Sequence, residues 1–111
     1  MNRRTQGYEW ERLVLNYYLD NGYQHVVSNF TIRWGEIDLI VENSDTTVFI
    51  EVKVIDHIDD LFGYITEKKL YFLRKAIAYY CHAHPTKNTI RIDVAFVKEG
   101  KIVEIYENIG G

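Results

Sequence analysis

The chain has 111 residues, of which 47% are hydrophobic and 26% charged, and its formal net charge at pH 7 is −3. This length is enough for one hydrophobic core, so we predict a single domain over residues 1–111. No stretch reaches the ~18 unbroken apolar residues of a membrane span, and no apolar run follows the charged start as it would in a secretory signal. These features exclude a membrane protein and favour the cytoplasm, and the acidic balance argues mildly against general nucleic-acid binding.

The first half of the chain predicts one helix and then three strands. The helix runs from Thr5 or Gln6 to Asn21, where apolar residues recur at helical spacing, and it stops before Gly22. Alternating or continuous apolar residues then predict strands. The strands are expected at residues 23–33, 34–41 and 47–55, and the turn composition of 43–46 makes the last two a hairpin.

The second half predicts a helix and two more strands. Thr66 caps a helix over 67–82, and Pro85 forbids its continuation. The last strands are expected at 90–97 and 102–106, followed by a Gly-Gly tail. The order α-β-β-β-α-β-β predicts an α/β fold, a mixed five-stranded sheet flanked by helices, with a right-handed crossover between the third and fourth strands. The acidic loop over 56–60 has no predicted role.

The hairpin brings charged residues together. A turn centred between Ser44 and Asp45 places Asp38 opposite Glu51, and Glu36 opposite Lys53. Two carboxylates about 5 Å apart repel by roughly 3 kcal/mol at an effective dielectric near 20, which an ordinary strand pair would avoid. A hard divalent cation between them reverses that repulsion, and oxygen ligands suit Mg²⁺ or Mn²⁺. The hairpin therefore predicts a metal site.

Motifs spread over most of the chain support the same hypothesis. They are Glu11 in the first helix, Gly22-Tyr23, Asn29, Gly35-Glu36-Ile37-Asp38-Leu39-Ile40, Phe49-Ile50-Glu51-Val52-Lys53, Lys69 with Leu73 and Ala76, and Arg91-Ile92-Asp93-Val94. In these residues and their spacing the sequence resembles the YraN-type family of small bacterial proteins. It also resembles, more broadly, the PD-(D/E)xK or restriction-endonuclease-like nuclease superfamily, with archaeal Holliday junction resolvases as a more distant match.

The resemblance implies a restriction-endonuclease-like fold and a Mg²⁺-dependent endonuclease that hydrolyses DNA phosphodiester bonds. Its catalytic residues would be Glu11, Asp38, Glu51 and Lys53. Asp38 and Glu51 would bind the metal together with the backbone carbonyl of Val52, and Lys53 would position and help deprotonate the attacking water. Glu11 would complete a second metal position or orient that water. Glu36 is expected to be the ion-pair partner of Lys53 rather than a ligand.

Contacts to DNA are expected from cations directed at the phosphate backbone, since no base-reading motif is visible. Cleavage would then be structure-selective, and the analogy with the resolvases favours branched or junction DNA cut by a symmetric homodimer. The candidate cations are Arg3, Arg4, Arg12, Arg33, Lys68 and Lys69.

Two alternatives stay open at this point. Basic residues usually follow the Glu-x-Lys motif in the YraN-type family, whereas Val54-Ile55-Asp56 follows it here, and Trp10 stands where the family has glycine. A non-catalytic nucleic-acid or protein-binding module that keeps the nuclease fold would fit this loss of positive charge. The charged hairpin face could also be an ordinary solvated sheet face.

Overall fold

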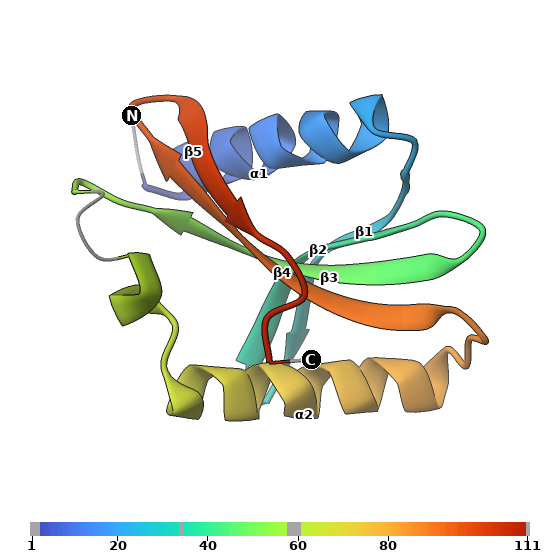
Figure 1. Cartoon of the computed structure of the whole chain (residues 1–111). Coiled ribbons are helices and arrows are strands. Elements are labelled where there is room, and N and C mark those ends of the chain that lie inside the picture. The colour runs from blue at the N-terminus through green and yellow to red at the C-terminus, as the bar shows by residue number, and fades with distance from the viewer. Residues whose placement is uncertain (1–2, 34, 58–60, 111) are drawn as a thin grey trace.

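A five-stranded sheet with one α-helix on each face forms the protein (Figure 1). The computed structural model describes residues 3–33, 35–57 and 61–110, and within these ranges the side chains of residues 3–8 and 62 are not described. The expected hairpin start at Trp34 and part of the acidic loop, 58–60, lie outside the described residues. The elements are α1 (Arg3–Asp20), β1 (Gln24–Ile32), β2 (Gly35–Glu42), β3 (Thr46–Val54), the 3-10 helix η1 (Leu61–Tyr64), α2 (Glu67–Ala83), β4 (Thr89–Lys98) and β5 (Lys101–Tyr106).

The strands lie in the order β1-β2-β3-β4-β5. Only β3 and β4 pair in parallel, and α2 makes the connection between them, as a parallel pair requires. The other three pairings are antiparallel. The mixed five-stranded sheet flanked by helices is therefore confirmed, whereas η1 is not predicted by the sequence. Neither described α-helix is long and apolar enough to cross a membrane.

The ends of both helices follow from local residues. Gly22 adopts a φ of 90°, and the N–H groups of Gly22 and Tyr23 donate to the carbonyls of Leu19 and Tyr18, which closes the last turn of α1. Thr66 caps α2 as predicted, because its Oγ1 accepts a hydrogen bond from the Lys69 N–H at 3.1 Å.

The predicted hairpin register is confirmed where β2 and β3 pair. Leu39 lies opposite Ile50 and Glu42 opposite Thr47, so the turn is centred between Ser44 and Asp45. Asn43 holds this turn, since its Oδ1 accepts hydrogen bonds from the N–H groups of Asp45 and Thr46 at 2.9 and 2.8 Å.

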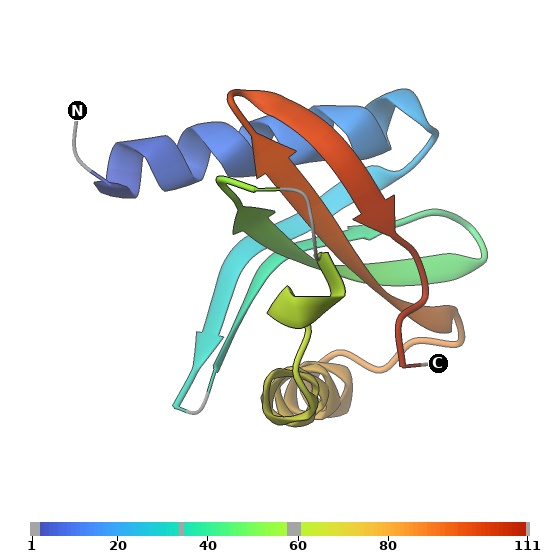
Figure 2. The same ribbon diagram turned by 60° about the vertical axis from the view of Figure 1, so that its left-hand side comes forward.

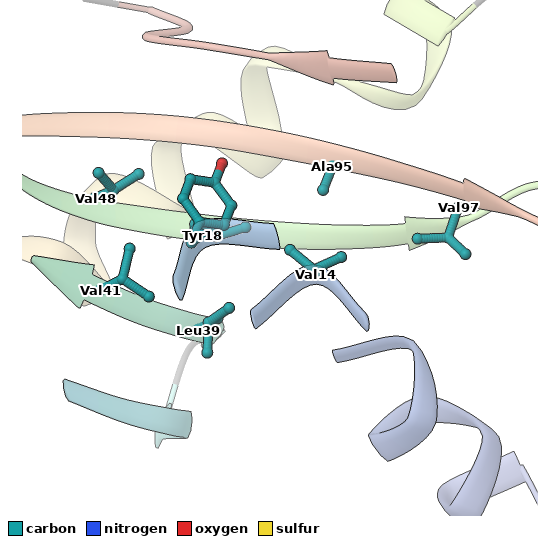
Figure 3. Close-up of a cluster of buried hydrophobic side chains, with 8 residues drawn as sticks. Val14, Tyr18, Leu39, Val41, Val48, Ala95 and Val97 are labelled. Carbon is teal, nitrogen blue, oxygen red and sulfur yellow. The ribbon is translucent and has the colours of Figure 1, made fainter. Parts of the chain in front are cut away.

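One face of the sheet packs against α1. Val14 and Tyr18 of the helix are buried against Leu39, Val48 and neighbouring apolar side chains of β2, β3 and β4 (Figure 3). Trp10 and Leu13 pack at the edge of this cluster, as the helical spacing predicts. Tyr17 does not, because 39% of its surface is exposed.

The other face packs against α2 and η1 (Figure 2). Leu70, Leu73 and Ile77 of α2 are buried, in agreement with the predicted helical pattern. The segment after β5 returns to this face, since the Ile109 N–H donates to the Ile92 carbonyl and Arg74 donates to the Gly110 carbonyl at 2.9 Å. The predicted Gly-Gly tail is therefore held in place at Gly110, because Arg74 donates to its carbonyl.

A buried carboxylate ties α1 to the sheet. Asp93 has no exposed surface, and it accepts hydrogen bonds from the Tyr18 hydroxyl at 2.6 Å and from two guanidinium nitrogens of Arg91 at 3.0 Å each. The Asn108 N–H donates to it as well, at 3.0 Å. Burial and the charge of Asp93 raise the pKa of Tyr18, so its hydroxyl remains the donor. The Arg91-Ile92-Asp93-Val94 motif thus has a structural use here.

We expect Asp93→Asn to lower the free energy of unfolding by about 3–5 kcal/mol, because the substitution leaves the Arg91 guanidinium without its charged partner. Tyr18→Phe should cost less, roughly 1.5–3 kcal/mol, since it removes one hydrogen bond to a charged group. Urea denaturation measures both, with Tyr17→Phe on the exposed side of α1 as the control. An Asp93→Asn protein as stable as the wild type would contradict the assignment.

Candidate active site

Asp38 lies at the point where β2 and β3 separate. The paired residues of the two strands extend to Leu39 and Ile50 and go no further in this direction. Beyond that pair, the Val52 N–H donates to Asp38 Oδ2 at 2.7 Å, so a carboxylate takes the place of the backbone acceptor that β2 no longer offers. Asp38 and Val52 are therefore brought together, as predicted for two neighbours of a metal site.

Asn29 in β1 has an unusual backbone conformation. Its φ is 56°, in the left-handed region that asparagine tolerates better than most residues. Asn29 lies level with Asp38 of β2, since Ser28 pairs with Leu39 and Phe30 with Ile37 on either side. The Asn29 side chain forms a hydrogen bond with Glu11 of α1. Asn29 thus connects the helical glutamate to the level of the sheet at which Asp38 lies.

Glu51 holds two lysines from different elements. Its Oε1 lies 2.9 Å from the Nζ of Lys69 in α2 and 3.7 Å from the Nζ of Lys53, two residues further along β3. Only 12% of the Glu51 side chain is exposed, against 29% and 33% for Lys53 and Lys69. The predicted ion pair between Lys53 and Glu36 is wrong: Lys53 lies beside Glu51 instead, because β2 and β3 no longer pair beyond Leu39 and Ile50.

The carboxylates repel one another. Burial, together with the negative charge of Glu51, raises the pKa of Asp38 to about 8 despite the hydrogen bond from Val52. Burial also raises the pKa of Glu11, with smaller contributions from the charges of Glu36 and Glu51 and an opposing hydrogen bond from Asn29. Without a cation, Asp38 is therefore protonated at neutral pH.

The two lysines differ in charge preference. Burial and the adjacent Lys69, which is hydrogen-bonded to it, lower the pKa of Lys53. Burial also acts to lower the pKa of Lys69, but its hydrogen bonds with Lys53 and Glu51 and the negative charge of Glu51 outweigh burial and raise it. Lys69 thus keeps its proton more firmly, while Lys53 releases its proton more readily than an ordinary lysine.

Asp38, Glu51 and Lys69 line a cleft of about 390 Å³ between the strands and the first turns of α2. Glu11 and Lys53 are not among the described residues that line it. One wall carries Glu36, Asp38 and Glu51, and the other carries Thr66, Lys68 and Lys69. The second wall includes the N-terminal turn of α2, where backbone N–H groups and the helix dipole favour anions. The cleft therefore places a wall of carboxylates opposite a wall with positive electrostatic character.

The donor chemistry of the first wall fits a hard divalent cation. Asp38 and Glu51 supply carboxylate oxygens, which Mg²⁺ and Mn²⁺ prefer. Burial and, after it, the negative charge of Glu51 raise the pKa of Asp38, and a cation beside Asp38 would oppose this rise. In the described parts of the chain, no three His, Cys, Asp or Glu side chains are grouped closely enough to hold a metal. Such a site would therefore depend on two carboxylates completed by oxygens of the backbone, water or substrate.

The candidate DNA-contacting cations divide into three groups. Lys68 lines the cleft and Lys69 binds Glu51 inside it. Arg12 on α1 and Arg33 after β1 are exposed, and neither is among the described residues that line the cleft. Arg3 and Arg4 begin α1, but their side chains lie outside the description.

Two site residues are not assigned their structural roles by sequence reasoning. Lys69 is predicted only to contact DNA, yet it precedes Leu73 by one helical turn, and this spacing already places it on the side of α2 that faces the sheet. Asn29 is quoted as a motif residue without a role. An asparagine inside a strand pattern is unusual and signals a bend or a left-handed residue.

Comparison with known proteins shows the family of this chain. The model of the Uncharacterised protein family UPF0102 matches residues 10–97. The chain belongs to this family. A UPF0102 protein of Carboxydothermus hydrogenoformans is 41% identical over 86 residues, covering 74% of this chain and 71% of that protein. One from Helicobacter hepaticus is 32% identical over 109 residues, which cover 98% and 97% of the two chains.

This membership confirms the YraN-type resemblance and leaves the activity open. One further relative, from Clostridioides difficile, is 35% identical over 99 residues and covers 85% of each chain. The names of all three describe only a UPF0102 protein and state no substrate or reaction. The placement of the family among the restriction-endonuclease-like nucleases is therefore a proposal.

We expect the metal-free protein to lose stability as the pH rises from about 4 to 8. An unfolded aspartate has a pKa near 3.9. Because the folded pKa of Asp38 is about 8, the folded state binds more protons in this window and its advantage falls as the pH rises. Asp38→Asn should flatten this decline, and Mg²⁺ at pH 8 should stabilise the wild type but not the variant.

Urea denaturation at several pH values, with and without Mg²⁺, measures both effects. Asp45→Asn is the matched control, since this carboxylate is exposed in the turn between β2 and β3. If Mg²⁺ stabilises the Asp38→Asn protein as much as the wild type, the cation binds elsewhere.

Proposed function

We propose that this protein is a Mg²⁺- or Mn²⁺-dependent endonuclease that hydrolyses DNA phosphodiester bonds. The observation that carries the proposal is the cleft in which Asp38 and Glu51 face the N-terminal turn of α2, with Lys53 and Lys69 beside Glu51. When bound, the divalent cation would polarise the scissile phosphate and stabilise charge on the leaving oxygen. Asp38, Glu51 and the Val52 carbonyl would hold it.

Lys53 is the residue best suited to receive a proton. Burial and Lys69 lower its pKa, so a larger fraction of its amine is neutral and can take a proton from the attacking water. Glu11, which reaches the site from α1 and is fixed by Asn29, would orient this water or complete a second metal position. General base catalysis supplies a rate enhancement of about 10² to 10⁴, which is less than phosphodiester hydrolysis requires. Much of the remaining rate enhancement must therefore depend on the carboxylates that would hold the cation.

The opposite wall suits a phosphate of the DNA backbone. Lys68 is exposed at the mouth of the cleft, and Thr66 marks the helix N-terminus beside it. Both features attract an anion without reading its sequence. This supports structure-selective cleavage, for which branched or junction DNA is our preferred substrate by analogy with the resolvases.

We expect the wild type to cleave at least one of four labelled DNAs, single-stranded, duplex, flap and four-way junction, with Mg²⁺ or Mn²⁺. Glu51→Gln should reduce the rate by roughly 10² to 10³ through lost metal binding, worth several kcal/mol of barrier. Lys53→Met should reduce it by about 10² to 10⁴. Gel electrophoresis of the products measures the rates, with Asp45→Asn purified identically as the control.

Cleavage that the Glu51→Gln protein retains in full would come from a contaminant and would contradict the proposal. Failure to cut any of the DNAs would favour the second candidate, a binding module that keeps the fold without turnover. The acidic net charge and Val54-Ile55-Asp56 after the Glu-x-Lys motif are the observations that favour this alternative.

If the substrate is a four-way junction, the protein must act as a symmetric homodimer, since two strands are cut by two sites. We expect light scattering of the complex to give the mass of one junction plus twice the mass of the chain. A strict monomer, both free and on the junction, would exclude junction resolution while leaving cleavage of flaps or single strands open.

A further inference from the structure

Helix α2 presents a row of aromatic and basic side chains on the side that points away from the sheet. Lys68, Tyr71, Lys75 and Tyr79 are spaced by three, four and four residues, so they lie along one side of the helix, and we call this row the outer face of α2. Figure 2 views the helix nearly end-on, with the sheet and η1 on one side and no other element on the opposite side. The outer face is thus open to a partner.

We infer that the outer face of α2 binds a single strand of DNA and leads it into the cleft. The inference rests on the proposed function for the choice of DNA, and it adds the form of DNA that the protein prefers. The DNA segment bound by this face would be the unpaired arm of a flap or the open strand of a branched substrate.

The two tyrosines are exposed to an unusual degree. Tyr71 and Tyr79 expose 53% and 58% of their surface, the two largest values among the exposed large apolar side chains of the described residues. Along the helix axis they are about 12 Å apart, at 1.5 Å per residue. Two open rings at this spacing can stack on bases several positions apart in one strand.

The rings are also held in place by neighbours. The Lys75 Nζ lies 5.0 Å from the centre of the Tyr71 ring, and Tyr71 packs edge-on against Phe72 at 5.3 Å. The Tyr79 ring lies 6.4 Å from that of Phe30 in β1. Such ordering lowers the conformational entropy that stacking on a base would cost.

The charge of α2 is opposite to that of the whole chain. Lys68, Lys69, Arg74 and Lys75 lie on this helix together with a single acid, Glu67, whereas the formal net charge of the chain is −3. A phosphate backbone is therefore attracted along α2 more strongly than toward the molecule on average. Arg74 also binds the Gly110 carbonyl.

The outer face is continuous with the cleft. Lys68 belongs to both, and Phe72, which contacts Tyr71, lines the cleft as well. A strand that stacks on Tyr79 and Tyr71 would thus pass Lys68 and reach Asp38 and Glu51. Duplex DNA fits less well, because its bases are stacked on one another and offer no free faces to the two rings.

The experiment measures binding without cleavage. Fluorescence anisotropy of a labelled 20-nucleotide single strand and of the matching duplex is recorded in EDTA, for the wild type and for the Tyr71→Leu/Tyr79→Leu double variant. We expect the wild type to prefer the single strand and the double variant to bind it at least roughly tenfold more weakly, from the loss of two stacking contacts. The Tyr71→Phe/Tyr79→Phe protein should bind within about twofold of the wild type, because phenylalanine stacks equally well.

Tyr17→Leu is the matched control, since Tyr17 is an exposed tyrosine on α1, away from this face. Urea denaturation of every variant separates lost binding from lost folding. The inference would be overturned if the wild type bound no DNA or bound duplex and single strand with equal affinity. It would also be overturned if Tyr17→Leu weakened single-strand binding as much as the Tyr71→Leu/Tyr79→Leu substitutions. Self-association that only the Tyr71→Leu/Tyr79→Leu substitutions abolish would overturn it too, by showing that a second copy occupies the face.

The Glu51→Gln protein separates this inference from the proposed function. If it binds the single strand like the wild type while the wild type itself cuts none of the four DNAs, the face is supported and the nuclease fails. Cleavage by a wild type that shows no preference for single strands gives the opposite result, in which the nuclease stands and the outer face fails.

Discussion

The hydrogen bond from the Val52 N–H to the Asp38 carboxylate is the interaction on which the site depends. Strands that separate inside a sheet leave backbone groups without partners, and a buried N–H without an acceptor is costly. Asp38 supplies that acceptor at the residue where β2 leaves β3. The strands can therefore part at this level, and the cleft opens between them and α2. Asn29, with its left-handed backbone, lies in β1 at the same level.

The arrangement concentrates negative charge that a purely structural sheet would disperse. Burial and, after it, the charges of neighbouring carboxylates raise the pKa values of Glu11 and Asp38 above their ordinary range. Lys53 and Lys69 compensate Glu51, and Asp38 is compensated by a proton. The two ammonium groups are partly exposed, unlike the Arg91–Asp93 pair, in which the carboxylate is fully buried and bound by two nitrogens. The two acidic centres thus differ in how fully their charges are paired inside the protein.

The sequence predicts what depends on periodicity and turn geometry. The alternation of β2 and β3 and the turn at Ser44 and Asp45 are local, so the register that brings Asp38 toward Glu51 follows from them. The pairing of Lys69 with Glu51 and of Arg74 with Gly110 depends on where α2 docks, which tertiary packing decides. The η1 turn has no periodic signal because it is only four residues long. The separation of the strands beyond Leu39 is likewise invisible, and it is why Glu36 does not meet Lys53.

The distribution of charge connects the cleft to the outer face of α2. An acidic molecule repels DNA over most of its surface, so an approaching backbone is attracted where cations outnumber acids, which is along α2. The same helix points its N-terminal turn, with Lys68 and Lys69, across the cleft at the carboxylates. In the proposed nuclease, one element would thus provide both the path for the phosphates and the wall opposite the carboxylates. The positive charge that is missing after Lys53 would then come from α2, on the other side of the cleft.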